Sequence, residues 1–182
     1  TLSGFSSLFE MYKTNPVLYA VVNIKAREYA NMKIRVRNRK SLLIEPLTTN
    51  KTIPRKVYQL YRRPNPAQTT WEFLKQRKVF LEVCGNSFTN FAKPVGLPVT
   101  LDNIQAMWNV WPHYMEVSLT GKYFSATVLS DIIKGWKFKF GQYEKEWGSS
   151  EILHQNAPNI DPMNGIIFGT SNIYSLIKPL SN

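Results

Sequence analysis

Side chains that serve catalysis and metal binding are scarce in this sequence. Its 182 residues include one cysteine, Cys84, and two histidines, His113 and His154, which share no metal-ligand spacing. A single cysteine excludes an internal disulfide and a cysteine-rich metal site. The acidic residues after Pro94 are scattered, with no close pair of the kind used in two-carboxylate hydrolysis or two-metal nucleases. We therefore predict that the protein is not an enzyme and holds no metal.

One catalytic alternative stays open at Cys84. A thiol paired with a histidine would be a nucleophile. Cys84 nevertheless lies on a predicted apolar helix face, where a cysteine is usually a small buried residue. The packing interpretation is strongly favoured.

Sequence signatures of nucleotide-dependent and hydrolytic enzymes are absent as well. The chain has no G-x-x-x-x-G-K-[ST], no G-x-G-x-x-G and no G-x-S-x-G segment, so no cofactor is expected. No apolar run approaches the roughly 20 residues that cross a bilayer, and no signal segment opens the chain, so no membrane partner is expected. Neither end carries a terminal signature, which favours a piece of a longer chain.

Positive charge is abundant and unevenly placed. The formal net charge is +11. Residues 1–93 hold 17 basic and 5 acidic side chains, whereas residues 94–182 hold 6 basic and 7 acidic side chains. This asymmetry indicates a basic face toward nucleic acid or an acidic partner, and a merely solvated surface is an equal alternative.

One cluster of basic residues spans Lys33–Lys40. From Met32 to Val36 apolar side chains alternate with cations, which predicts a half-buried strand with one cationic face. Such a face could contact phosphate, but a charged edge strand that resists further pairing is the favoured interpretation. The candidates for subunit or DNA contact are Arg35, Arg37, Arg39, Lys40, Arg62, Arg63 and Arg77.

Helices are predicted in the first half. Asn15 and Pro16 suit the cap and first turn of a helix over Asn15–Ala30, and a shorter helix is predicted over Arg55–Arg62. The Pro64-Asn65-Pro66 turn then leads into a helix with a capping box from Thr69 to Glu72, although Thr70 is an alternative cap. Gly85-Asn86 ends this helix, and a strand with Phe88 and Phe91 follows.

Arg77 is the exception on this last helix. The apolar face is formed by Phe73, Leu74, Phe80, Leu81 and Cys84. Arg77 falls in the middle of it, which predicts either a paired charge or a subunit contact.

The second half is predicted to be mainly β. Tyr114–Leu119 and Tyr123–Leu129 form an expected hairpin around Thr120-Gly121-Lys122. Trp136–Phe140 alternates aromatic and lysine side chains, which predicts an aromatic core face and a solvated lysine face. A short strand is expected at Glu151–His154, where His154 is satisfied by a hydrogen bond, and a helix from Asn172.

These patterns predict an α+β fold, with N-terminal helices packed on a largely antiparallel or mixed sheet. We expect one domain over residues 1–182. Residues 1–86 are mainly helical and basic, residues 87–168 are mainly β, and residues 169–182 begin a helix.

The order of these motifs resembles tailed-bacteriophage portal proteins of the HK97 type. The resemblance runs from about Asn15 to Ile177 and rests on Leu60, Pro64-Asn65-Pro66, Thr69, Glu72-Phe73, Gly85-Asn86, Trp111-Pro112, Glu151-Ile152-Leu153-His154 and Gly169-Thr170-Ser171. Departures occur at Trp111, where the family has an aliphatic residue, and at Cys84, where it usually has tyrosine.

The resemblance implies a structural subunit, with this chain as the N-terminal wing portion. Portal proteins form a dodecameric ring at one capsid vertex, through which double-stranded DNA is packaged and ejected. The implied partners are further copies of the chain, terminase, capsid and head-tail adaptor proteins, and the DNA. The implied location is the virion, with assembly in the bacterial host cytoplasm. The alternative is a basic nucleic-acid-binding adaptor without catalysis.

Overall fold

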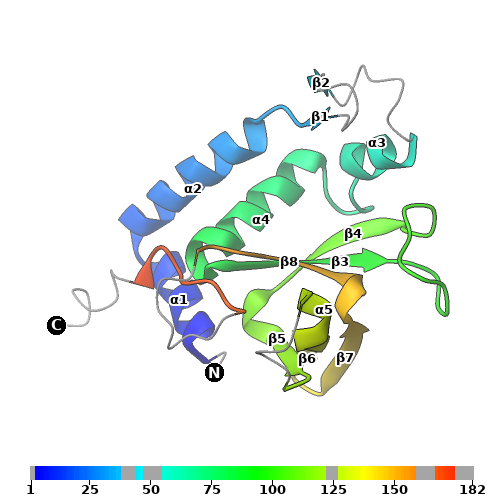
Figure 1. Ribbon diagram of the computed structural model, residues 1–182. Coiled ribbons are helices and arrows are strands. Elements are labelled where there is room, and N and C mark those ends of the chain that lie inside the picture. Colours follow the sequence, from blue (N-terminus) through cyan, green and yellow to red (C-terminus); the bar gives the residue numbers. More distant parts are fainter. Residues whose placement is uncertain (1–2, 38–43, 47–54, 122–126, 159–166, 175–182) are drawn as a thin grey trace.

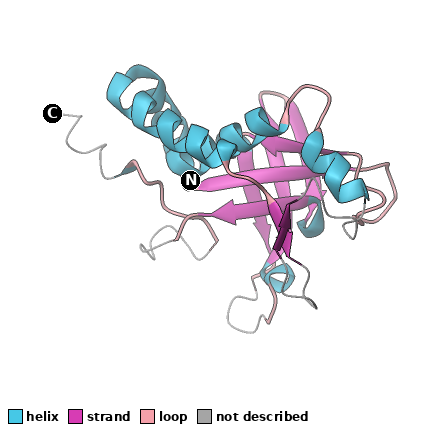
Figure 2. Cartoon of the chain, turned by 90° about the horizontal axis from the view of Figure 1, so that it is seen from above, coloured by secondary structure: helices cyan, strands magenta, loops and turns pink. Residues whose placement is uncertain are grey.

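The protein is described from a computed structural model that places residues 3–37, 44–46, 55–121, 127–158 and 167–174 (Figure 1). The fold is α+β, as predicted. Four helices lie in the first half, at α1 (Ser3–Thr14), α2 (Pro16–Asn31), α3 (Arg55–Arg62) and α4 (Thr70–Cys84). The strands come mainly after them. Figure 2 shows the helices and strands from above. In the described part of the chain, no helix is long and apolar enough to cross a membrane.

The predicted helix caps are confirmed. The Asn15 side chain accepts hydrogen bonds from the amides of Val17 and Leu18, and Pro16 opens α2. At α4, the Thr69 amide donates to Glu72 Oε2 at 2.8 Å, while the Glu72 amide donates to Thr69 Oγ1 at 3.3 Å. Both pairs satisfy donors that a helix start leaves without partners.

The proline turn before α4 is tied to a distant strand. Asn65 is buried, and its Nδ2 donates to the Met107 carbonyl at 2.9 Å. The Met107 amide in turn donates to the Pro64 carbonyl at 2.7 Å. A pair of prolines fixes the backbone on both sides of Asn65 and so presents its amide to the sheet.

Within the described residues, the strands form three small antiparallel sheets. The central one has the order β4 (Ala106–Val110), β3 (Asn86–Ala92), β8 (Ile152–Asn156). The second has the order β5 (Met115–Leu119), β6 (Ile133–Phe140), β7 (Tyr143–Gly148). The third pairs β1 (Arg35–Arg37) with β2 (Ile44–Pro46).

The hairpin prediction after β5 is wrong. The partner of β5 is β6, with Met115 opposite Phe138 and Val117 opposite Trp136. Leu129 instead begins a short helix, α5 (Leu129–Ile132), and residues 122–126 lie outside the described part. Asp131 explains the difference, because its carboxylate accepts from the Val128 amide and bends the chain into a helical turn.

Other boundaries also differ from the prediction. The cationic strand begins at Arg35 rather than Met32, and its partner β2 lies inside the predicted connection. Neither α1 nor β7 was predicted, because α1 lacks a clear cap and β7 carries alternating charges with little apolar content. The predicted helix from Asn172 falls largely outside the described residues.

The predicted alternation of aromatic and lysine side chains between the two faces of β6 is confirmed. Trp136 is buried and Phe138 partly buried, while Phe140 at the strand end is 55% exposed. The lysine face carries ion pairs: Lys137 lies 2.7 Å from Glu144 and Lys139 lies 3.3 Å from Glu116. These pairs cross between neighbouring strands, which stabilises their register modestly.

Separate apolar clusters join the layers. Phe80, Val83 and Cys84 of α4 pack with residues of α1 and α2. Phe73 and Leu74, at the other end of α4, pack with Ile104 and Met107 beside the central sheet. Helix α4 therefore connects the two halves: Phe73 packs beside the central sheet, and the Phe80 ring lies 5.3 Å from that of Trp111, which follows β4.

Candidate interface sites and the junction that positions them

A buried asparagine organises the point where α4 becomes β3. Asn86 is fully buried, and its Nδ2 donates to the carbonyls of Cys84 at 2.8 Å and Gly169 at 3.0 Å. Its Oδ1 accepts from the Gly169 amide at 2.9 Å. The side chain thus pairs with Gly169 in both directions, as a strand backbone would, and holds the segment 167–174 against the end of α4.

Two glycines make this approach possible. Gly85 has φ of +68°, and a Cβ there would lie 2.4 Å from the Thr170 carbonyl carbon. A Cβ on Gly169 would lie 2.4 Å from the Gly85 oxygen and 2.5 Å from the Ala157 oxygen. Since the obstructing atoms are backbone, neither position has room for a side chain.

His154 completes the junction from β8. Its ring stacks on Phe88 at 4.6 Å between centroids, and its Nε2 lies 3.0 Å from Asn86 Oδ1. The amide oxygen is an acceptor, so Nε2 carries the proton and donates. Burial lowers the pKa of His154 to about 4, so the ring is neutral at pH 7. The prediction of a histidine satisfied by a hydrogen bond is confirmed.

This histidine predicts a loss of stability in mild acid. Its folded-state pKa of about 4 lies below the ordinary value of about 6.5, so the unfolded chain takes up the proton first. Stability should therefore fall as the pH drops from about 6.5 toward 4, by at most about 3 kcal/mol from this group. Urea unfolding at several pH values measures it. A His154→Gln variant should lose this part of the pH dependence, and an unchanged slope would contradict the assignment.

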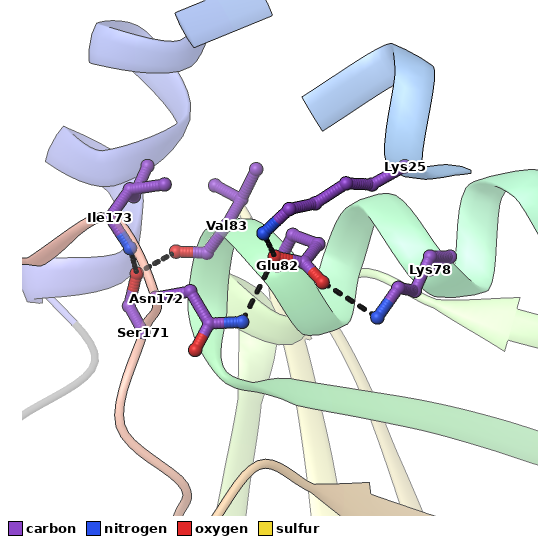
Figure 3. A network of polar contacts seen from close by, with 7 residues as sticks. All are labelled: Lys25, Lys78, Glu82, Val83, Ser171, Asn172 and Ile173. Carbon is purple, nitrogen blue, oxygen red and sulfur yellow. Dashed lines mark hydrogen bonds and ion pairs between the residues drawn. The ribbon is translucent and has the colours of Figure 1, made fainter. Parts of the chain in front are cut away.

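Glu82 forms a second polar contact with the same C-terminal segment (Figure 3). Its side chain is 5% exposed and lies 2.6 Å from Lys78 Nζ and 3.3 Å from Lys25 Nζ. Asn172 Nδ2 donates to Glu82 Oε2 at 2.9 Å. Burial alone would raise the pKa of Glu82, but hydrogen bonds from Lys78 and Asn172 and the two lysine charges outweigh it and lower the pKa.

Replacing this carboxylate should weaken the attachment of the segment. We expect Glu82→Gln to destabilise the protein by about 1–2 kcal/mol at pH 7, because charge-assisted hydrogen bonds are lost. The Glu82 pKa is lower in the folded state, so the carboxylate's contribution is complete above the ordinary pKa and is lost as the pH falls through the folded value. The difference between wild type and variant should therefore shrink below pH 4.5. A difference that grew in acid would contradict this account.

The structure brings most of the predicted cationic candidates to one end of the molecule. Arg35 and Arg37 lie in β1, and Arg62 and Arg63 lie at the end of α3. Figure 1 shows β1 and α3 together at the end remote from α1. Arg62 and Arg63 are exposed and line an open groove of about 600 Å³ beside the proline turn. Arg39 and Lys40 lie outside the described residues.

Arg77 is separate from this group. It is half-buried in α4, and its Nε is buried without a hydrogen-bond partner among the described residues. It makes no ion pair in that part of the chain, so the predicted paired charge is not found there. Its role as a subunit contact stays a prediction.

Cys84 has the packing role that was favoured. It is fully buried in the helical cluster, and burial raises the pKa of its thiol. A thiol in this state is a poor nucleophile, because the thiolate is the reactive form. The described residues contain no group of three histidine, cysteine or acidic side chains able to hold a metal ion.

Sequence reasoning missed most of the junction. Gly85-Asn86 was identified as a helix end, but the pairing of Asn86 with Gly169 spans 83 residues and has no local signature. Glu82 offered a weak signal, because an acidic residue stands within the apolar run from Phe80 to Cys84.

Comparison with known proteins defines the fold. No family model and no curated protein matches the chain. Solved structures of gene transfer agent particles do match. A chain of the native virion has a TM-score of 0.68 at 16% identity. The match covers 97% of this chain and 41% of the virion chain.

Two structures of the neck agree with this. The neck of the empty particle, computed with C6 symmetry, has a TM-score of 0.70 at 15% identity over 96% of this chain. The neck of the native particle, computed with C12 symmetry, has a TM-score of 0.66 at 16% identity over 96% of this chain. The chain therefore shares its fold with these chains, and spans about two fifths of their length.

Proposed function

We propose that this chain is the wing portion of a tailed-phage portal protein of the HK97 type, a structural subunit of the ring that joins head to tail. The observation that carries the proposal is the fold, which matches neck chains over 96% of the sequence in particles computed with C6 and C12 symmetry. The order of the proline turn, capped helix and Gly-Asn stop supports it independently.

In this role the protein guides DNA and does not hydrolyse anything. Double-stranded DNA passes through a ring of twelve copies, and the packaging motor is a separate terminase. The chain has no phosphate-binding loop, which suits that division of labour. Capsid and head-tail adaptor proteins bind the outside of the ring at one vertex of the virion, after assembly in the host cytoplasm.

Disrupting the gene tests the proposal in its own particle. Particles made without a functional copy should form capsids that contain no packaged DNA and carry no tails. Supplying the intact gene in trans should restore both. Normal DNA content in the disrupted strain would overturn the proposal.

The basic end at β1 and α3 favours a second candidate, a DNA-binding adaptor. Both candidates give the cations there a function, as contacts to DNA or to a neighbouring subunit. Replacing Arg35, Arg37 and Arg39 by glutamate should therefore reduce assembly or DNA retention at least tenfold, measured as DNA-filled particles. Lys134→Glu, an exposed change in the neutral half, is the control and should have no effect. Unchanged particles from the triple variant would remove the functional interpretation of the basic end.

The two candidates differ in the isolated protein. An adaptor that neutralises several phosphates binds DNA alone, with affinity that falls steeply as salt is raised. A portal subunit needs the assembled ring to surround DNA. Fluorescence anisotropy with a short duplex at two salt concentrations separates them.

A further inference from the structure

Helix α2 exposes an apolar stripe along one flank. Val17, Val21 and Ile24 follow one another at spacings of four and three, so they share a side of the helix. Their exposed fractions are 71%, 47% and 60%. Within the described residues nothing covers these side chains, whereas a surface helix normally places polar residues there.

The other sides of α2 are occupied. Leu18 and Val22 face α4 and are buried. Tyr19 and Asn23 face α1, where Asn23 Nδ2 donates to the Tyr12 hydroxyl at 2.8 Å and the Tyr12 and Tyr19 rings stack at 5.2 Å. At 100° per residue, the stripe lies on the flank of α2 opposite to α1. It therefore points away from the rest of the helical layer.

A second apolar surface lies on the far side of α1. There an open groove of about 530 Å³ separates α1 from the β5-β6-β7 sheet. Ser6, Glu10 and Lys13 line it from α1. Opposite them, Trp111 and Phe140 are 46% and 55% exposed.

The groove also contains an unsatisfied polar atom. His113 Nδ1 is buried and has no hydrogen-bond partner among the described residues. Burial lowers the pKa of His113, and the charge of Lys13 at the rim of the groove lowers it further. The groove is thus mainly aromatic, and Lys13 at its rim is paired with Glu10 at 2.9 Å, so the two charges balance. Glu28 continues the α2 stripe one turn beyond Ile24.

We infer that these two surfaces meet between neighbouring copies of the chain, with the α2 stripe of one subunit seated in the aromatic groove of the next. This inference rests on the proposed ring function. A closed ring of identical subunits needs two different complementary faces on each subunit. The stripe lies beyond α2 at one side of the molecule, and the groove lies beyond α1 at the other. Each subunit can therefore contact one neighbour through its stripe and the other neighbour through its groove. The pairing buries both apolar surfaces.

Cysteine cross-linking tests the contact directly. The one native cysteine, Cys84, is fully buried and gives no background. In the full-length gene product we would introduce Ser6→Cys and Val21→Cys, singly and together, and treat assembled rings with a short bismaleimide. The double variant should give a ladder of covalent oligomers, and each single variant should give none. Covalent dimers from Val21→Cys alone, or only intramolecular links in the double variant, would overturn the inference.

A charge placed on the stripe provides a second test. Val21→Lys should reduce the fraction of protein in rings at least tenfold, measured by native mass spectrometry. Val95→Lys is the matched control, because Val95 is fully exposed in a loop away from both surfaces, and it should leave the rings unchanged. Intact rings with Val21→Lys would overturn this contact and leave the portal proposal standing. A wild-type protein that forms no rings would overturn both.

Discussion

The variant Gly169→Ala should unfold the protein or destabilise it by roughly 3 kcal/mol or more, beyond the range of about 1–3 kcal/mol for ordinary overpacking. Its new methyl group would lie 2.4 Å from the Gly85 oxygen and 2.6 Å from the Ala157 amide nitrogen. The backbone has no small rearrangement that clears several such atoms, because Asn86 holds Gly169 from both its amide and its carbonyl. Urea unfolding followed by circular dichroism measures the change.

A matched pair of glycines separates crowding from backbone strain. Gly85 and Gly96 both have positive φ, at +68° and +82°, but only Gly85 has atoms within reach of a new side chain. Gly96→Ala should therefore cost about 1–2 kcal/mol, the usual penalty for a left-handed residue. Gly85→Ala should cost clearly more. Equal losses of stability for the two variants would show that the close approach of the Thr170 backbone to Gly85 adds nothing to the cost of the substitution.

The variant Asn86→Leu should be nearly as damaging, with an expected loss of about 4 kcal/mol. Leucine has a similar size, so the change removes hydrogen bonds without opening a large cavity. The Gly169 amide, the Gly169 and Cys84 carbonyls and His154 Nε2 would lose a buried partner. Each buried group left unsatisfied costs about 1–3 kcal/mol.

Asn103→Leu is the control for this substitution. Asn103 also bonds a backbone carbonyl, that of Pro98 at 3.0 Å, but at an exposed site where water can replace it. Its loss should stay below about 1 kcal/mol. If the two variants proved equally mild, the buried amide would not be the centre of the junction.

Local structure was predicted best at the helix ends. The Asn15 cap, the Thr69–Glu72 capping box and the Gly85 stop are all confirmed, because each depends on residues within a few positions of one another. The aromatic alternation of β6 was also correct. The predicted Tyr123–Leu129 strand fails at its described end, because Leu129 begins α5 and the partner of β5 is β6; residues 122–126 lie outside the described part.

The junction could not be predicted in the same way. Asn86 and Gly169 are 83 residues apart, and neither residue type indicates from the sequence which residue it will contact. The cationic candidates were only partly informative. Charge counting identified the basic half, whereas the gathering of β1 and α3 at one end depends on how the chain folds back after α2 (Figure 1).

The junction gives the proposed ring subunit a defined shape. Helix α4, strand β3, strand β8 and the segment 167–174 meet at Asn86, and these hydrogen bonds tie the helical layer to the β layer. The α2 stripe and the α1 wall of the aromatic groove belong to helices that pack against α4 in one apolar cluster. A repeating contact between copies requires a fixed relation between its two surfaces, since small changes of angle would prevent a ring from closing.

Electron microscopy of the purified full-length gene product tests the central claim most directly. The portal account predicts closed rings, with twelvefold symmetry in end-on class averages. A protein that stays monomeric at micromolar concentration, or that forms only open filaments, would contradict it.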